Sequence, residues 1–585
     1  MDPCSEMLAS VMYPTAIFAP PLTDSPDASL DFGISALNPR NRLDSLQLPA
    51  DLQWRIDDGD IDGIRFFAVP FFAIGKPPLR IDVYIPGHSL HPAALKETLS
   101  SHKALTVSGS RLAKLGICCL ILQRLHLWSS SYDNFEAVYW SLPFGSRIIF
   151  GSICADLESI PVVIEPFYEI ERQWLSVKKL QELWPNLEGR WPPLLDHSEL
   201  QLKTQIHEAI TLVTISSHSQ PETFVFKSVS TDVKYFYHEL KNLLTIEPHP
   251  HIIQRPLYVV TKQCAFGGKV GVCGFIHKYY PLGSLQRALE DDQGHLLSQA
   301  HDKIRIARQI LSALIHIQRS PLEFYSDIKP NNILLSDHHG KAQVVMIDLE
   351  QRGAWRSWSP PEVHYIEFLE IVAHSKLVDE DTRRKYSKLM EQYIPGWSPP
   401  RRKARYTGSN QGYSQVWKAL SPQRQEAAQV YMFGKLLWCL FEDIGFPSNY
   451  VTPETFREKI SDLPFPEFRK SPALVRDCIN QCTAGALERK GCYPRVVRVG
   501  DKLYRRLPGS SLADTECTFA DVQAEARAWW RDEIRQGELY VAAWTGVLGE
   551  DGNGTDDAAE LLKSIEERPS FQELDGKLAT IHTAL

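Results

Sequence analysis

Apolar and polar positions divide the chain into stretches of different character. Residues 1–45 combine repeated prolines with Ser, Asp and Asn and show little periodicity, which is typical of a disordered tail. From about 46 to 195, short apolar runs such as GIRFFAVPFFAI (63–74) and PVVIEPFY (161–168) predict strands, and ERQWLSVKKLQELW (171–184) predicts a helix. We therefore expect a separate α+β N-terminal domain over residues 46–195.

The rest of the chain predicts a second α+β domain over about 200–580. TFVFKSVS (223–230) follows a strand-like pattern, and DVKYFYHELKNLL (232–244) is amphipathic at helical spacing. Two stretches are expected to interrupt this domain as insertions, at about 366–425 and at about 485–560. The first insertion is rich in Lys and Arg, which is more typical of a solvated face than of a nucleic-acid patch.

Composition narrows the function classes. The chain of 585 residues is 43% apolar and 23% charged, as in ordinary globular proteins, and its net charge of −8 gives no general attraction to nucleic acid. Eleven cysteines without a Cys-x-x-Cys pair favour reduced thiols and an intracellular, cytoplasmic location. The start lacks the features of a signal peptide, and the most apolar run, at 112–128, is too short and too charged to span a bilayer. We expect neither a nucleic-acid nor a membrane partner.

Polar residues that carry chemistry stand beside two neighbouring apolar runs. Asp327 and Asn332 precede Ile333-Leu334-Leu335, and Asp348 follows a second β-prone run. A hairpin of this kind can hold a metal–phosphate site, because one carboxylate orients a hydroxyl while an amide and a second carboxylate bind Mg²⁺. Lys329 adds a cation that can neutralise charge on a phosphoryl group. The simpler alternative is a turn rich in Asp and Asn that joins two strands.

This stretch resembles the catalytic loop and the metal-binding Asp of the protein kinase family. The family pattern is His-Arg-Asp-x-Lys-x-x-Asn followed by Asp-Phe-Gly; this chain has Tyr-Ser-Asp-Ile-Lys-Pro-Asn-Asn and Asp-Leu-Glu. The resemblance implies that Asp327 accepts the hydroxyl proton, that Lys329 stabilises the transferring charge, and that Asn332 and Asp348 bind Mg²⁺. Lys-Pro-Asn-Asn is the Ser/Thr form of the loop.

A second part of the resemblance lies upstream. Lys227, in Phe-Val-Phe-Lys, is similar to the kinase strand lysine, and Glu239 lies in the helix that follows. The resemblance implies that these two residues anchor the phosphates of ATP. VGVCGFIHKYYPLG (270–283) resembles the strand and hinge that hold adenine, which implies that His277 and Tyr279 border the ATP pocket. The implied fold is bilobal, with a small lobe at 200–278 and a large lobe at 279–580.

The third part of the resemblance lies between Asp348 and the end of the chain. Ser-Pro-Pro-Glu362 resembles the motif that closes the kinase activation segment, and Arg568 lies in a motif similar to the one that pairs with it. The resemblance implies a buried, structural ion pair between Glu362 and Arg568. VYMFGKLLWCLFED (430–443) resembles the central helix of the large lobe, with Gln429 where the family usually has Asp.

Departures from the family pattern leave three functions open. No glycine lies between Gly189 and Gly267, so the glycine-rich loop over the phosphates is missing, and Ser326 replaces the Arg that reads a phosphorylated activation loop. The favoured prediction is a divergent Ser/Thr protein kinase that uses ATP and Mg²⁺ on a protein substrate. The alternatives are a pseudokinase scaffold that binds nucleotide, and a small-molecule kinase, which Asp-Leu-Glu also resembles. The N-terminal domain is expected to bind a regulatory partner.

Overall fold

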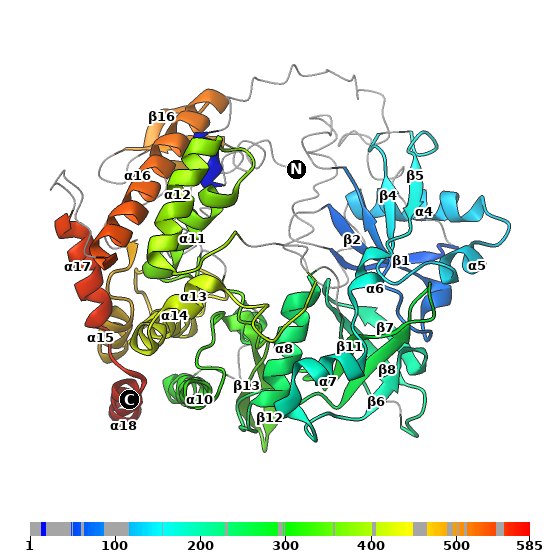
Figure 1. Cartoon of the computed structure of the whole chain (residues 1–585), viewed down its shortest axis with the longest axis horizontal. Coiled ribbons are helices and arrows are strands. Elements are labelled where there is room, and N and C mark those ends of the chain that lie inside the picture. The colour runs from blue at the N-terminus through cyan, green and yellow to red at the C-terminus, as the bar shows by residue number, and fades with distance from the viewer. Residues whose placement is uncertain are drawn as a thin grey trace.

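The computed structural model combines helices and strands throughout, as the α+β prediction requires (Figure 1). Most of the tail expected over residues 1–45 lies outside the described part of the chain. The described residues are 13–18, 48, 51–59, 64–86, 116–154, 156–220, 222–228, 232–290, 297, 299–354, 357–399, 405–447, 465–487, 495–499, 502–507, 512–545 and 555–585.

The first sheet and two helices form a unit with its own buried core, which we call the N-terminal unit. Its strands are β1 (Trp54–Gly59), β2 (Arg65–Pro70), β3 (Asp82–Tyr84), β4 (Arg147–Phe150) and β5 (Val162–Glu165). They pair in sequence order, antiparallel except for β3 with β4. The helices are α4 (Gly116–Ser130), which falls on the most apolar run, and α5 (Phe135–Trp140). Buried side chains of this unit form a cluster separate from the main core.

The second sheet has the strand order β6-β10-β11-β9-β8-β7. Its strands are β6 (Leu194–Asp196), β7 (Leu200–Gln205), β8 (Ile210–Ile215), β9 (Phe224–Ser228), β10 (Tyr258–Gln263) and β11 (Val270–Lys278). Helix α8 (Val233–Thr245) packs on the face that carries Lys227, because Phe275 lies directly opposite Lys227 in the β9–β11 ladder and its ring stacks on Phe236 with centroids 5.1 Å apart.

The predicted helix over 171–184 forms as two helices, α6 (Glu169–Gln173) and α7 (Val177–Leu183). Ser176 separates them, because its hydroxyl accepts from Lys179 N and caps α7. Trp174, between them, is fully buried against β11, where a Cβ on Gly271 would lie 2.6 Å from that of Trp174. Although these helices lie within the predicted range 46–195, their apolar side chains belong to the main core.

A mostly helical body follows the second sheet. It contains α9 (Leu285–Glu290), α10 (Ala300–Gln318), the hairpin β12 (Ile333–His338) and β13 (Lys341–Met346), α13 (Gln415–Ala419), α14 (Pro422–Glu442), α15 (Ala473–Cys482) and α18 (Phe571–Ala584). Every residue of α14 from Ala428 to Glu442 is buried, so this helix runs through the core. The body and the second sheet share one continuous buried cluster.

The described parts of the two predicted insertions pack against each other. They include most of α11 (Pro361–His374), which begins before the first insertion, α12 (Glu380–Tyr393), α16 (Phe519–Thr545) and the start of α17 (Thr555–Glu566), which ends after the second. The second insertion also holds the small sheet β14 (Val496–Val499), β15 (Lys502–Arg506) and β16 (Leu512–Glu516). Helices α11, α12 and α16 lie side by side in Figure 1, and the rings of Phe368 and Trp530 meet edge to face at 4.8 Å. The described part of the expected disordered tail forms a 3₁₀ helix, η1 (Pro14–Ile17), which packs on α16 and α11.

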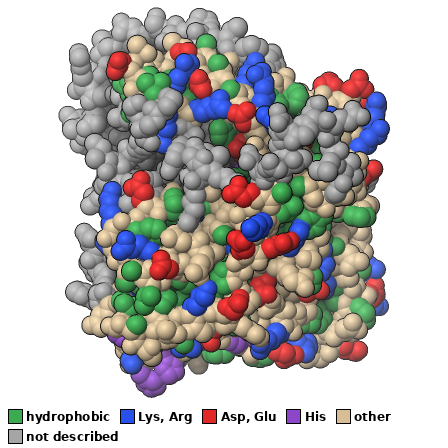
Figure 2. Space-filling model, turned by 90° about the vertical axis from the view of Figure 1, so that its left-hand side faces the viewer, with side chains coloured by type: hydrophobic (Ala, Val, Ile, Leu, Met, Phe, Trp, Pro, Cys, Tyr) green, Lys and Arg blue, Asp and Glu red, His purple; other side chains and the backbone are tan. Residues whose placement is uncertain are grey.

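Charges of both signs are interspersed over the face shown in Figure 2. Two basic residues of α12 form ion pairs: Arg384 with Asp381 at 3.0 Å, and Lys385 with Glu538 of α16 at 2.7 Å. Pairing of this kind fits a solvated helix face. Among the described helices, none has both the length and the apolar content needed to cross a bilayer.

Candidate functional site

Three of the predicted site residues meet in the loop before β12. Pro330 begins a single 3₁₀ turn, η8 (Pro330–Asn332), which turns Asn332 back toward Asp327. Lys329 Nζ lies 2.6 Å from Asp327 Oδ2, and Asn332 Nδ2 donates to the same oxygen at 2.9 Å and to the Asp327 carbonyl at 3.0 Å. All three residues are buried. The second carboxylate oxygen, Oδ1, is buried without a hydrogen-bond partner among the described residues.

Burial changes the acidity of this carboxyl. Desolvation raises the pKa of Asp327 to about 6, against the opposing effect of Lys329, while the nearby Asp348 raises it further. A carboxylate with a pKa near neutrality is suited to accept a proton at physiological pH.

Hydrogen bonds of two residues that differ from the protein kinase pattern hold this loop in place. Gln429 Oε1, on α14, accepts from Tyr325 N at 2.9 Å, and Tyr325 Oη donates to the Ile347 carbonyl at 2.7 Å. Gln429 therefore ties the backbone of the loop to α14, and the Tyr325 hydroxyl ties the loop to the strand end before Asp348. Sequence comparison flagged both positions only as departures.

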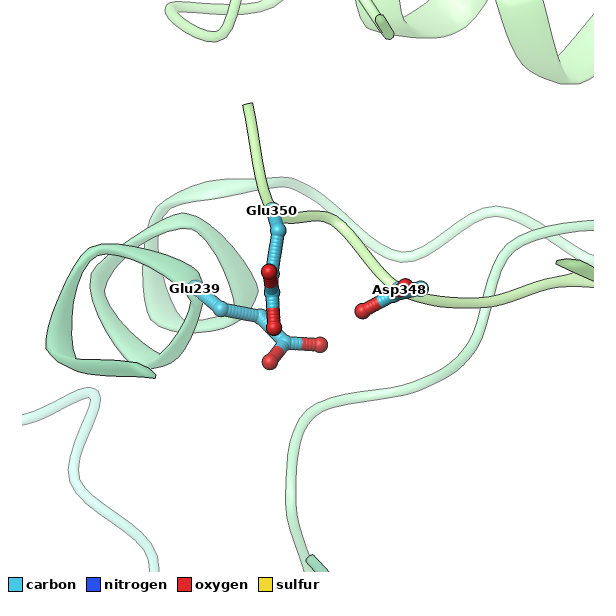
Figure 3. Close-up of side chains that lie close together, drawn as sticks. All are labelled: Glu239, Asp348 and Glu350. Atoms are coloured by element: carbon cyan, nitrogen blue, oxygen red, sulfur yellow. The ribbon is translucent and has the colours of Figure 1, made fainter. Parts of the chain in front are cut away.

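Lys227 lies at the centre of the site. Its Nζ is 2.6 Å from Glu239 Oε2, 2.6 Å from Asp348 Oδ1 and 3.5 Å from Glu350 Oε1. Figure 3 shows the three carboxylates converging from helix α8 and from the segment after β13. Asp348 has a φ of +61°, a left-handed backbone conformation that is uncommon outside glycine and that clusters at functional sites. The predicted strand lysine, helix glutamate and metal-binding aspartate are thus brought together.

The segment after Asp348 is tied to α8 by side chains one helical turn apart. Asn242 Nδ2 donates to the Leu349 carbonyl at 2.9 Å, and His238 Nε2 lies 2.9 Å from Gln351 Oε1. Gln351 Nε2 in turn donates to the Phe324 carbonyl, just before the loop that carries Asp327, at 2.8 Å. These bonds set the relative positions of the helix, the loop and the carboxylate segment.

Negative charge exceeds positive charge around Lys227. Burial alone would lower the pKa of Lys227, but Asp348, Glu239 and Glu350 outweigh it and hold the pKa above its usual value. Burial raises the pKa of Glu239 to about 8, since one ammonium group compensates its desolvation only in part. The pKa of Asp348 is lowered, because Lys227 overcomes the desolvation of that carboxyl.

This donor set suits a divalent cation. Oxygen atoms of Glu239, Asp348 and Glu350 lie within 4.8 Å of one another, and carboxylate oxygens are the ligands that Mg²⁺ prefers. Glu350 was missed as a candidate from the sequence. Its signal was an acidic residue two positions after Asp348, where the family pattern has glycine.

The two residues expected at the adenine pocket differ in their surroundings. His277 is buried on β11, on the same face of the sheet as Lys227, and desolvation lowers its pKa to about 3, so its ring is neutral. Tyr279 follows the end of β11 and is half-buried. The structure does not bring either residue into the cluster around Lys227.

The predicted ion pair between Glu362 and Arg568 also forms, outside this cluster. Arg568 Nη1 and Nη2 donate to Glu362 Oε1 at 2.7 Å and Oε2 at 3.3 Å, and both side chains are fully buried. Arg568 also donates to the Ala484 and Ala427 carbonyls. The pair thus joins the start of α11 to α14 and to the loop after α15.

A comparison with protein-family models finds no match to this chain, and a comparison with curated proteins finds none either. The functional argument therefore rests on the site itself.

Proposed function

We propose that this chain transfers the γ-phosphoryl group of Mg-ATP to a Ser or Thr hydroxyl of a protein, on a bilobal fold of the protein kinase type. One observation carries the proposal: Lys227 Nζ lies 2.6 Å from both Glu239 and Asp348. In protein kinases a strand lysine, a helix glutamate and a metal-binding aspartate must all be in place for transfer.

The surrounding architecture supports the same proposal. Lys227 lies on β9, the third strand of the meander β7-β8-β9, and Glu239 lies on the helix that follows, which is the kinase arrangement. The buried pair of Glu362 and Arg568 supports a kinase-type large lobe.

The geometry of the loop supports a separate proposed role for each oxygen of Asp327. Lys329 and Asn332 hold Oδ2, which leaves the buried Oδ1 as the atom that takes the proton. The substrate hydroxyl oxygen forms a bond to the γ-phosphorus while the bond from that phosphorus to the bridging oxygen of ADP breaks. The hydroxyl proton passes to Asp327, and ADP leaves. Lys329 places a positive charge beside the transferring group.

The residues around Asp348 would hold the Mg²⁺ ion. Asp348 and Asn332 are the proposed ligands, and Glu350 supplies a further carboxylate near Asp348. Bound Mg²⁺ supplies charge neutralisation for the phosphates. Lys227, held by Glu239, is proposed to bind the α- and β-phosphates by charge-assisted hydrogen bonds.

Transfer of labelled γ-phosphate tests the proposal and separates it from its alternatives. The purified chain is supplied with labelled Mg-ATP and cell extract, and label is counted separately in protein and in small molecules. We expect label in protein that disappears in Asp348→Asn and persists in Asp337→Asn, an exposed residue on β12. Label only in small molecules would favour a metabolite kinase, and no label in either fraction would favour a scaffold.

A further inference from the structure

The hairpin β7–β8 lies where a protein kinase has its glycine-rich loop, but its turn contains no glycine. Residues 206–209 form a tight turn in which Ile206 N donates to the Ile210 carbonyl at 3.0 Å and Ile210 N donates to the His207 carbonyl at 3.2 Å. Glycine allows such a hairpin to close over phosphates, because its backbone is unrestricted. A hairpin without glycine needs another means of being held over the phosphates.

Strand β7 is held along its free edge by the N-terminal unit. Gly75 N donates to the Leu202 carbonyl, and Leu202 N donates to the Lys76 carbonyl, both at 2.9 Å. Gln205 N donates to Asp57 Oδ2 at 2.8 Å. The side chain of Leu202 is buried in the core of the N-terminal unit rather than in the main core. Strand β7 therefore belongs to the second sheet and also contributes to the core of the N-terminal unit.

Two arginines of the N-terminal unit reach the tip of the hairpin. Arg65 lies 2.6 Å from Asp82, which fixes its orientation, and 2.6 Å from Glu208. Arg80 is 5% exposed and makes no ion pair within 4.0 Å in the described chain; its Nη2 donates to the His207 carbonyl at 3.3 Å. A buried guanidinium that donates to the backbone of the turn restrains the turn directly.

The tip lies within electrostatic range of the site. Desolvation lowers the pKa of His207, and the charges that act on it include Asp348 and Lys227. Arg352 lies in the segment after Asp348. Burial by itself would lower the pKa of Arg352, but nearby acids, Glu208 among them, outweigh burial and raise it. Charges of the site therefore act on the turn residue His207, and the turn residue Glu208 acts on Arg352.

We propose that the N-terminal unit clamps the β7–β8 hairpin over the phosphates of Mg-ATP and so replaces the missing glycine-rich loop. Arg65 and Arg80 are positioning residues in this arrangement, and Glu208 is the contact through which Arg65 acts. The inference rests on the proposed function, since it names what positions the nucleotide at that site. It assigns the N-terminal unit a role within the chain itself.

Glu208→Gln tests the clamp, with Glu222→Gln as the matched control. Glu208 is 37% exposed, so its substitution leaves the cores intact, and Glu222 is an exposed acid in the β8–β9 loop of the same sheet. A partly exposed ion pair changes an equilibrium constant by about 2- to 5-fold. We expect KM for Mg-ATP to rise by about that factor in Glu208→Gln, with kcat close to that of the control.

Two further readouts separate positioning from a purely structural effect. Amide hydrogen exchange of residues 206–210 should become faster in Glu208→Gln than in the control, while the thermal midpoints of the two variants stay equal. The difference in KM between Glu208→Gln and wild type should shrink at high salt, because salt screens the pair that only wild type has.

Each other outcome overturns the clamp in a recognisable way. Faster exchange with an unchanged KM would mean that the hairpin is anchored but does not cover the nucleotide. Unchanged exchange would mean that the ion pair does not hold the hairpin. A wild-type chain that neither binds nor uses Mg-ATP would overturn the proposed function, and the clamp with it, before any variant is compared.

Discussion

Replacing Asp327 by Asn is expected to remove activity and yet to make the fold less sensitive to rising pH. The buried Asp327 carboxyl has a pKa of about 6 instead of its usual 3.8, chiefly because of desolvation. A group whose pKa is raised by folding stabilises the fold while it is protonated. Its contribution is fully present below pH 3.8 and is lost as the pH rises through about 6.

The magnitude follows from the two pKa values. A change from 3.8 to about 6 corresponds to ~3 kcal/mol of stability that wild type loses between about pH 4 and pH 7. The Asn side chain does not titrate, so Asp327→Asn escapes this loss. The difference in free energy of unfolding, variant minus wild type, should therefore increase by up to ~3 kcal/mol from about pH 4 to pH 7.

Urea unfolding of the full chain between pH 4 and pH 8 measures this difference, with Asp337→Asn, an exposed site in the same hairpin, as the control. In parallel, kcat/KM for wild type should rise with pH through about 6, and Asp327→Asn should lower it by about 10²- to 10⁴-fold. A stability difference that stays constant from pH 4 to pH 7 would refute the raised pKa. An unchanged kcat/KM would refute the role as base.

Three further predictions follow from packing and charge. Glu362→Gln leaves the buried Arg568 without its anion and should lower the free energy of unfolding by about 3–5 kcal/mol; a smaller loss when Arg568→Met is added would show that the unpaired charge is the cause. Glu350→Gln removes one of three carboxylates near Lys227 and should raise the Mg²⁺ concentration for half-maximal transfer by about tenfold, whereas an unchanged requirement would exclude Glu350 from the site. Trp530→Ala empties a fully buried position between the two insertions and should lower the free energy of unfolding by about 3–5 kcal/mol in denaturant titration; a loss below about 1 kcal/mol would contradict this packing.

Local elements of the site could be predicted because they are close in sequence. Asp327, Lys329 and Asn332 lie within six residues, so one 3₁₀ turn is enough to bring their side chains together. Helix α8 formed where its amphipathic pattern predicted it, within two residues at either end. In these cases backbone geometry and periodicity, which are local, decide the outcome.

Partners that are distant in sequence could be proposed only through a family resemblance. Lys227 and Asp348 are 121 residues apart, and Glu362 and Arg568 are 206 apart. Nothing in the periodicity of either segment specifies such a contact. Glu350 was missed because a charged residue after Asp-Leu reads as a solvated side chain until the surrounding carboxylates are known.

The sequence by itself determined the α+β class, the positions of some helices and strands, such as α8 and β9, and the residue types available for phosphate and metal chemistry. The tertiary structure alone decided that Arg65 reaches Glu208 across 143 residues, that Leu202 belongs to the N-terminal core, and that Gln429 holds Tyr325. The physical reason is that hydrophobic periodicity records only which face of an element is buried. Which other element covers that face, and which charges then lose their water, depends on how the whole chain packs.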